Sequence, residues 1–450
     1  MKQTGIVICN YNKCQDVLNC IQSVLESRYT DYDLFVVDNA STDDSVAQIT
    51  QKYGDRLTLL VNKKNLGGSG GFNTGLRKIL ASGYEYAVCL DNDILVDENA
   101  IGALADFLNH HPETGMVGSI VYHMEEPDYV QQYGLNIDFN NYVAETLYSN
   151  HPHDDSIPEM MYCDTVATCS MMVRTGILSQ TGIMPEDNFI YWDDMEWGYR
   201  CNLAGYKVAV TKQSVVLHRM GAKKVSVNTF PTYYMWRNWI HFFMRYVKEE
   251  DLERFSYIML KAVFQTIYES MYRGEHNVRE TVLYAYDDAL HGIRGKASEG
   301  KIFDADQTCD LLNTLLTHQF QQDGSRPVRI IKNGYEKEAN TLLAHLTRLY
   351  PGHKVTIVDE DKKTQTENEI TLRLCDYIFN LTETDLSLAS KTADPDGYLN
   401  DIFIDTGLTP VTTTEELELV KAYNLSQQVF LYANQPLFLH CAREIRKKIC

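Results

Sequence analysis

The sequence has no run of about 20 consecutive apolar residues, which is the length that a transmembrane helix requires. Its first residues, MKQTGIVICN, contain no apolar segment of the kind found in secretory signal peptides. Basic residues are also scarce, because 41 Lys and Arg stand against 61 Asp and Glu, for a formal net charge of −20. A chain without a basic excess cannot neutralise many phosphates, so we expect no nucleic-acid partner and no general attraction to anionic lipid. We expect a cytoplasmic protein. Peripheral contact with the inner face of the cell membrane is left open.

The cysteines form no disulfide or zinc-binding pattern. There are 11 of them, an odd number, and no two are spaced as C-x-x-C. Cys9 and Cys89 lie inside apolar stretches, where a cysteine packs as a small hydrophobic residue. This usage is typical of a reducing cytoplasm. Low-complexity tracts are absent as well, and 44% hydrophobic and 23% charged residues indicate an ordinary globular protein.

Short apolar strands alternate with amphipathic helices over the first part of the chain. Lys13 to Arg28, for example, carries apolar residues at helical spacing. Such alternation predicts an α/β fold with a mostly parallel sheet covered by helices on both faces. The expected strands are Gly5 to Cys9, Leu34 to Val37, Leu57 to Val61 and Tyr86 to Leu90, followed later by Thr165 to Val173, Lys207 to Val210 and Val215 to His218.

A polar segment follows each of the first four expected strands. Ligands of such sheets bind beyond the carboxyl ends of the strands, so we expect these segments to share one edge of the sheet. They are Asn10-Tyr11-Asn12, Asp38-Asn39, Asn62 through Gly71, and Asp91-Asn92-Asp93. The sequence therefore predicts a single site at this edge.

The triplet Asp91-Asn92-Asp93 comes directly after the apolar run YAVCL. Two carboxylates two positions apart at the end of a strand can hold Mg²⁺ or Mn²⁺, which favour oxygen ligands and can also bind a diphosphate. A solvated surface turn is the alternative, since turns favour Asp and Asn. His218, which closes VVLH, is either a core histidine or a further metal ligand through its imidazole nitrogen.

Two other segments suit a nucleotide. Asp38 lies where a carboxylate can accept the imide N–H of uracil or thymine, and Ser41 or Thr42 can cap the helix that begins near Asp43. The segment Asn65 to Asn73 is rich in glycine, which lets the backbone approach a ligand closely at a helix N-terminus. It lacks the Lys-Ser/Thr of a phosphate loop, and a plain flexible loop is the alternative.

The segment Trp192 to Trp197 places the carboxylates of Asp193, Asp194 and Glu196 between aromatic residues at the start of an expected helix. Acidic residues in a first helical turn stabilise the helix dipole. Burying like charges among aromatic rings is costly unless a cation or a substrate compensates them. The pattern therefore also favours a general base in this segment.

Three domains are expected: residues 1–225, a helical extension over 226–320, and a small Rossmann-like α/β domain over 321–450. Within the extension, Tyr233 to Val247 fits either a core helix or an interfacial helix that meets a lipid-linked acceptor. The last domain has no nucleotide-binding fingerprint. Its expected strands are Val328 to Ile331, Lys354 to Val358, Tyr377 to Phe379, Ile402 to Ile404 and Val429 to Leu431.

Five segments together resemble the family-2 glycosyltransferases of the GT-A fold, over roughly residues 4 to 220. They are VICNYNKCQDVLNCIQSVLES, VVDNASTDDS, NLGGSGGFNTG, LDNDILV and YWDDMEWGYR, in that family's order and spacing. The glycine-rich segment and W-D-D-x-E most resemble bacterial rhamnosyltransferases and galactofuranosyltransferases of cell-wall, capsule and O-antigen synthesis. The resemblance implies an inverting, metal-dependent transfer of galactofuranose or rhamnose from a UDP- or dTDP-sugar. The acceptor would be a hydroxyl of a cell-surface polysaccharide or of a lipid-linked glycan precursor.

The resemblance also implies a role for each site residue. Asp194 would be the catalytic base, and the acceptor would be bound by Trp192, Asp193 and Glu196. Mn²⁺ or Mg²⁺ would be ligated by Asp93, His218 and Asp91. The donor nucleotide would be bound by Asn10, Tyr11, Asn12, Asp38, Asn65, Gly67, Gly68, Asn73 and Asp91. Assembly into a homo-oligomer is left open.

Two features depart from the family's pattern, and two rival functions are left open. The related subgroups often have Asp where this chain has Asn92, and the C-terminal domain has no assigned role. A sugar-nucleotidyltransferase would need a basic, glycine-rich loop near the first strand, which Asn10 to Lys13 does not provide. The other rival is a non-catalytic scaffold in a polysaccharide biosynthetic complex.

Overall fold

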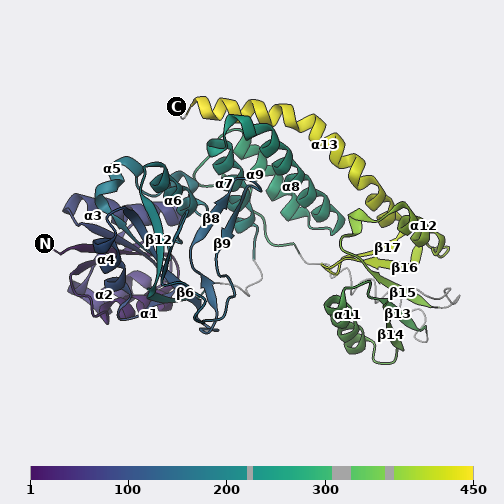
Figure 1. Ribbon diagram of the computed structural model, residues 1–450, viewed down its shortest axis with the longest axis horizontal. Coiled ribbons are helices and arrows are strands. Elements are labelled where there is room, and N and C mark those ends of the chain that lie inside the picture. The colour runs from purple at the N-terminus through teal and green to yellow at the C-terminus, as the bar shows by residue number, and fades with distance from the viewer. Residues whose placement is uncertain (1, 220–226, 307–325, 360–368, 449–450) are drawn as a thin grey trace. The chain divides into compact units, whose positions relative to one another are not determined.

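The computed structural model describes residues 2–219, 227–306, 326–359 and 369–448 (Figure 1). The chain divides into two compact units. The first comprises Met1–Met259, Tyr284–Phe303 and Leu439–Cys450, and the second comprises Leu260–Leu283 and Asp304–Phe438. Of the helices that the structure describes, none is both long enough and apolar enough to cross a membrane.

A ten-stranded sheet forms the centre of the first unit. Its order is β10-β12-β6-β11-β4-β1-β2-β3, with β5 paired to β12 and β7 paired to β6. β1, β2, β3 and β4 are parallel, as the alternation of strands and helices predicts, and β11 runs antiparallel to β4. The strands are β1 (Thr4–Asn10), β2 (Tyr32–Asp38), β3 (Thr58–Val61), β4 (Tyr86–Asp91), β5 (Ile94–Val96), β6 (Thr114–His123), β7 (Val130–Gln132), β10 (Met160–Cys163), β11 (Ser170–Arg174) and β12 (Lys207–His218). A separate hairpin is formed by β8 (Leu135–Asp138) and β9 (Val143–Thr146).

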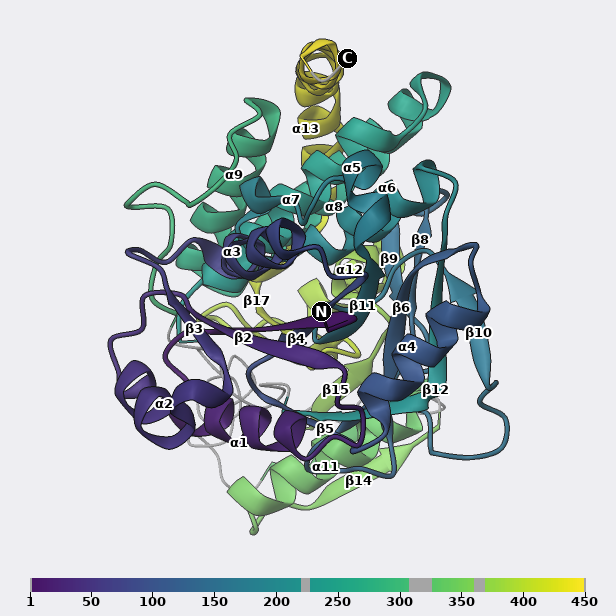
Figure 2. The same ribbon diagram turned by 90° about the vertical axis from the view of Figure 1, so that its left-hand side faces the viewer.

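Helices cover both faces of the parallel strands (Figure 2). On one face, Ile6 and Ile8 of β1 pack with apolar residues of α1 (Cys14–Leu25), α2 (Ser45–Tyr53) and α4 (Ala100–His110). On the other face, Val7 packs with α3 (Gly67–Ser82). Alternate residues of β1 thus enter two different cores, which is why this strand reads as a continuous apolar run.

The glycine-rich segment is helical from Gly67. A Cβ at Gly71 would lie 2.3 Å from Sγ of Cys9, and one at Gly75 would lie 2.3 Å from Cγ2 of Val7. Both contacts are far closer than carbon atoms tolerate, so only glycine lets α3 rest directly on β1. The segment is therefore not a plain flexible loop.

The strand register brings the predicted polar segments to one edge. Asn10 lies opposite Asp38 at the ends of β1 and β2, and Cys9 lies opposite Asp91 at the end of β4.

The remaining helices are α5 (Leu178–Thr181), α6 (Asp193–Leu203), α7 (Phe230–Tyr246), α8 (Leu252–Tyr272) and α9 (His276–Leu290). The two strands predicted at 207–210 and 215–218 form the single strand β12, whose pairing with β6 shifts register between Thr211 and Val215.

The second unit contains a five-stranded sheet in the order β14-β13-β15-β16-β17, in which the β16–β17 pair is antiparallel. Its elements are β13 (Val328–Ile331), α11 (Glu336–Leu349), β14 (Val355–Val358), β15 (Ile370–Leu374), α12 (Glu383–Lys391), β16 (Tyr398–Ile404), β17 (Pro410–Thr413) and the part of α13 (Thr414–Lys447) that ends at Phe438. Two predicted strands are wrong: Val429 to Leu431 lies inside α13, and Ile378–Asn380 is a 3-10 turn. Three apolar residues in a row carry no period, so such short runs do not separate helix from strand.

Candidate active site

Three side chains that can ligate a metal meet at the carboxyl edge of the large sheet. Asp91 ends β4, Asp93 follows it in the turn to β5, and His218 ends β12, which pairs with β5. One ligand atom from each of the three lies within 4.8 Å of the others. Nε2 of His218 is 3.3 Å from Oδ1 of Asp93. Two carboxylates and one imidazole are a suitable donor set for a divalent cation.

The ring of His218 is oriented by a residue that the sequence did not reveal. Nδ1 of His218 lies 2.8 Å from Oε1 of Gln131, which is buried on β7. An amide oxygen only accepts a hydrogen bond, so Nδ1 donates, and Nε2 is the nitrogen available on the side of the carboxylates. Metal-ligating histidines are oriented in this way by a hydrogen bond from the other ring nitrogen.

The electrostatics of the cluster favour a bound cation. Burial raises the pKa of Asp91, and the neighbouring charge of Asp93 raises it further. Burial also opposes ionisation of Asp93, but the hydrogen bond with His218 and the charges of His218 and Lys13 hold its pKa below the usual range. Nζ of Lys13 lies 2.5 Å from Oδ2 of Asp93. Two adjacent carboxylates at a buried edge thus require positive charge, and the residues present fit a divalent ion.

Hydrogen bonds explain why position 92 carries an amide, Asn92, and not the carboxylate that is frequent in the family. Its Nδ2 donates to Oδ1 of Asn10 at 2.8 Å, and Nδ2 of Asn10 donates to Oδ1 of Asp38 at 3.2 Å. Asp38 fixes the direction of this chain because a carboxylate only accepts. All three side chains are buried. An amide at position 92 therefore satisfies Asn10, whereas a carboxylate would face an acceptor oxygen.

We expect Asn92→Asp to lower the free energy of unfolding by about 1–3 kcal/mol, because it leaves Oδ1 of Asn10 without its donor in a buried place. Urea unfolding at neutral pH measures this loss. Asn19→Asp, at an exposed position of α1, is the matched control and should leave stability unchanged within about 0.5 kcal/mol. Equal unfolding midpoints for the two variants would contradict the role given to Asn92.

A cavity of about 520 Å³ opens beside the ends of β1 and β4. The predicted nucleotide-binding residues that line it are Tyr11, Asn65, Gly67, Gly68 and Asp91. Asn10 and Asp38 are buried in the hydrogen-bonded chain described above. Asn12 accepts from the backbone N–H of Thr42 at 2.7 Å, and Asn73 donates to the carbonyl of Met184 at 2.7 Å. The structure thus brings five of the nine predicted residues to this cavity and gives the other four supporting contacts.

A second cavity, of about 870 Å³, shares Gly68, Phe72, Asp91 and Ile190 with the first. Trp192, Asp193, Asp194 and His218 line it, as do Trp236 and Trp239 of α7. Asp91 therefore borders both cavities, and His218, a second candidate metal ligand, lines the larger one.

The first turn of α6 carries two carboxylates into the second cavity. Asp193 accepts a hydrogen bond from Oγ of Ser69 at 2.7 Å, and Oδ1 of Asp194 accepts from the backbone N–H of Met195 at 2.8 Å. Burial raises the pKa of Asp194, and with the adjacent charge of Asp193 the value reaches about 7. A carboxylate with a pKa near neutrality in a cavity is suited to accept a proton from a bound hydroxyl.

Residues 5–172 match the family described as Glycosyl transferase family 2. The chain contains a family-2 glycosyltransferase domain. The predicted family and the GT-A type of fold are thereby confirmed.

The relatives of this chain are distant. A galactofuranosyltransferase of Mycolicibacterium smegmatis is 23% identical over 260 residues, which cover 52% of this chain and 40% of that protein. A UDP-Glc:α-D-GlcNAc-diphosphoundecaprenol β-1,3-glucosyltransferase of Escherichia coli is 24% identical over 51% of this chain and 82% of its own length. Among solved structures, GalNAc-T7 with UDP, GalNAc and Mn²⁺ aligns with 57% of this chain and 50% of that chain, at 12% identity and a TM-score of 0.46. The chain thus spans less than half the length of the galactofuranosyltransferase.

The loop that leads into α6 has an unusual backbone. Phe189, Tyr191 and Trp192 have φ angles of 69°, 62° and 61°, in the left-handed region that is unfavourable for bulky residues. Each such residue costs about 1–3 kcal/mol, and such strain persists only where surrounding contacts hold the chain.

Two polar residues of α7 supply those contacts. Nδ2 of Asn238 lies 2.9–3.0 Å from the carbonyl oxygens of Asn188, Ile190 and Tyr191. Arg237 donates to the carbonyl of Asn188 as well, at 2.9 Å. The sequence alone assigns neither residue a role at the site. An adjacent Arg-Asn pair inside an aromatic helix is a signal that could have indicated buried polar contacts.

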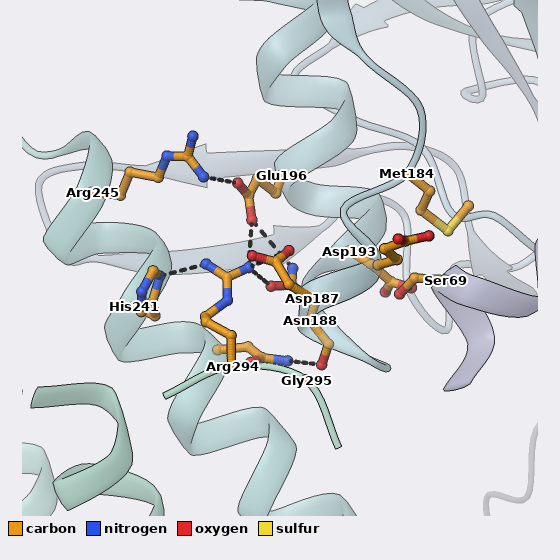
Figure 3. A network of polar contacts seen from close by, with 12 residues as sticks. Ser69, Met184, Asp187, Asn188, Asp193, Glu196, His241, Arg245, Arg294 and Gly295 are labelled. Atoms are coloured by element: carbon orange, nitrogen blue, oxygen red, sulfur yellow. Dashed lines mark hydrogen bonds and ion pairs between the residues drawn. The ribbon is translucent and has the colours of Figure 1, made fainter. Parts of the chain in front are cut away.

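Glu196 does not share the surroundings of Asp193 (Figure 3). Its carboxylate is 2% exposed and lies 2.6 Å from Arg200, 2.8 Å from Arg245 and 3.4 Å from Arg294. Burial would raise its pKa, but the three arginines lower it to about 2. Of the acceptor-binding residues that the resemblance implied, the structure brings Trp192 and Asp193 to the second cavity and leaves Glu196 in this arginine cluster.

Helix α7 is mainly a core helix. Tyr233, Tyr234, Ile240, Phe242 and Phe243 are all buried. Its partly exposed Trp236 and Trp239 line the second cavity, and Nε1 of Trp239 donates to the carbonyl of Tyr142 at 2.7 Å. The core interpretation of Tyr233 to Val247 therefore accounts for most of the segment.

Proposed function

We propose that this glycosyltransferase moves a sugar from a UDP- or dTDP-sugar, with inversion, to a hydroxyl of a cell-surface polysaccharide or a lipid-linked glycan. The observation that carries this proposal is the meeting of two cavities at Asp91. One cavity is lined by the residues expected to bind a nucleotide, and the other by the carboxylates expected to bind and activate an acceptor.

The donor would occupy the smaller cavity, with its base toward Tyr11 and Asn65 and its diphosphate toward Asp91 and Asp93. Gly68 lies between the two cavities, and the nearest atom to a Cβ at this position is 3.9 Å away on Ile190. Its missing side chain would leave room for the transferred sugar. A divalent cation held by Asp91, Asp93 and His218 would supply positive charge next to the departing diphosphate.

The acceptor would enter the larger cavity beside Trp236 and Trp239 and present its hydroxyl to Asp194. The Asp194 carboxylate takes the hydroxyl proton as the oxygen attacks the anomeric carbon. The nucleoside diphosphate leaves from the opposite side of that carbon. One displacement with attack opposite the leaving group inverts the configuration, so no covalent sugar–enzyme intermediate is required.

The choice of substrates rests on chemistry and on one relative. The name of the Escherichia coli relative pairs a UDP-sugar with a diphosphoundecaprenol-linked acceptor. We propose the same classes of donor and acceptor here, with galactofuranose or rhamnose as the transferred sugar. A lipid-linked acceptor would bring the enzyme to a membrane surface as a peripheral protein.

A thermal-shift screen tests the proposed function. UDP, dTDP and GDP, and sugars attached to each, are added with Mn²⁺ or with a chelator. Ligands that bind the folded state stabilise it by RT ln(1 + [L]/Kd), so UDP or dTDP at about 100 times its Kd should add about 2.7 kcal/mol. Failure of all three nucleotides to shift the melting temperature would contradict the proposal.

The pKa of Asp194 predicts the pH dependence. A base must be ionised, so kcat/KM should rise with pH through about 7 and reach a plateau above it. One pH unit below the pKa, the rate should be about tenfold below the plateau. The profile of donor turnover against pH measures this, with donor affinity followed in parallel. A flat profile between pH values of about 5.5 and 8.5 would exclude Asp194 as the titrating base.

A further inference from the structure

The segment Ile293 to Phe303, which follows α9, forms part of the donor cavity. Lys296, Ala297 and Ile302 line it together with the predicted nucleotide-binding residues. The segment belongs to the same compact unit as the large sheet. It lies far beyond residue 172, where the match to the family ends. The motifs of the first two hundred residues therefore assign nothing to it.

Backbone contacts fix this segment on both sides of Lys296. The N–H of Gly295 donates to the carbonyl of Asp187 at 2.5 Å, and Nη1 of Arg237 donates to the carbonyl of Gly295 at 2.7 Å. On the other side, the N–H of Ala297 donates to Oη of Tyr234 at 2.8 Å. The backbone that carries Lys296 is thus tied to α7 and to the loop that leads into α6.

Arg294 adds a side-chain anchor to the same loop (Figure 3). Its guanidinium lies 3.1 Å from Asp187 and 3.4 Å from Glu196, and its side chain is 11% exposed. Nη1 donates to Nδ1 of His241 at 2.7 Å. Burial and the charge of Arg294 lower the pKa of His241 to about 3, so the imidazole is neutral and can accept. The position of the segment is therefore built into the fold.

Lys296 gives the cavity a positive charge that is not paired with a carboxylate of the described residues. The basic residues among the described lining are Lys13 and Lys296. Lys13 is paired with Asp93, whereas Lys296 is exposed and forms no ion pair within the part of the chain that the structure describes. The cavity also contains Asp91, whose carboxylate would repel an anion. A nucleoside diphosphate in this cavity therefore needs a cation that is not already neutralised.

We propose that Lys296 binds the diphosphate of the nucleotide-sugar donor, so that the segment Ile293 to Phe303 completes the donor site. This assignment rests on the proposed function, because it needs a nucleoside diphosphate in this cavity. Lysine binds phosphate as a mobile point charge through a flexible stem, and here the backbone at its base is anchored. The contribution of Lys296 to the binding affinity should depend on the charge of the phosphates, so the affinity for the nucleoside alone should not change.

Calorimetric titration of UDP, UMP and uridine, and of the matching thymidine compounds, tests this assignment in the presence of Mn²⁺. We expect Lys296→Met to weaken binding of the diphosphate about tenfold, the size of one charge-assisted phosphate contact. Uridine or thymidine should bind as it does to the unmodified protein. Lys296→Arg should keep most of the affinity, and the loss in Lys296→Met should shrink at high salt because exposed charges are screened. Lys78→Met, at an exposed position of α3, is the matched control and should bind like the unmodified protein.

The outcomes separate the two proposals. If the unmodified protein binds UDP or dTDP and Lys296→Met binds it equally well, the assignment of Lys296 is overturned and the proposed function stands. An equal loss for the diphosphate and for the nucleoside would overturn it too, because the effect would not depend on phosphate. If the unmodified protein binds no nucleoside diphosphate, the proposed function fails and the role of Lys296 fails with it.

Discussion

Asp194→Asn is expected to lower kcat by about 10²- to 10⁴-fold, which is the usual contribution of a general base. The amide keeps the size of the side chain and can still accept the backbone N–H of Met195 through its oxygen. It cannot take a proton from the acceptor hydroxyl. Because Asp194 lines the larger cavity and not the smaller one, the affinity for the donor should stay within about twofold.

Turnover and donor affinity must be measured on the same preparation. Sugar transfer gives kcat, and calorimetric titration with the donor gives Kd. Asp155→Asn, at an exposed position before β10, is the matched control and should leave both values unchanged. A kcat within a factor of about two of the unmodified enzyme would refute the assignment of the base, and an equal loss of donor affinity would point to a role in binding.

Asp93→Asn should weaken binding of Mn²⁺ by about two orders of magnitude and reduce kcat/KM at least as much. The substitution removes one anionic ligand and leaves the ammonium of Lys13 without its partner at the metal site. His218→Gln removes the imidazole and should have an effect in the same direction. Mn²⁺ affinity measured by electron paramagnetic resonance follows the site independently of turnover.

Asp97→Asn controls for the loss of one acidic charge near this edge. Asp97 directly follows β5 and is exposed, so its substitution should leave the affinity for Mn²⁺ unchanged. Normal metal-dependent turnover by Asp93→Asn would show that the cluster of Asp91, Asp93 and His218 is not the metal site.

The sequence predicted the site best where strand register alone decides position. Asn10, Asp38 and Asp91 each end an apolar run, and parallel pairing brings such ends together without help from distant segments. A local acidic–aromatic pattern singled out Trp192, Asp193 and Asp194, and all three line the larger cavity.

Residues that act through long-range contacts were missed. Gln131 orients His218 from 87 positions away, and Asn238 bonds to carbonyl groups about 50 positions earlier in the chain. No local period or motif encodes such pairs, because they arise only when β7 or α7 packs against the site. Glu196 shows the converse: its motif position suggested acceptor binding, but its neighbours Arg245 and Arg294 come from segments that the motif does not contain.

Local patterns were also insufficient where they were short. The residues Val429 to Leu431 are apolar, which fits either a strand or a helix. Only the continuous helix Thr414–Lys447 around them shows that they are helical. Similarly, the glycines of α3 indicate that its backbone closely approaches another group, but the sequence does not identify that group. The structure shows that Gly71 and Gly75 approach β1, while Gly68 borders the two cavities.

The most direct test of the central claim is a calorimetric titration of the protein with UDP and with dTDP, each in the presence of Mn²⁺ and of a chelator. We expect one of the two nucleotides to bind with one site per chain, and at least about tenfold more tightly when Mn²⁺ is present. Equal affinity with Mn²⁺ and with the chelator would contradict a metal-assisted donor site at Asp91, Asp93 and His218.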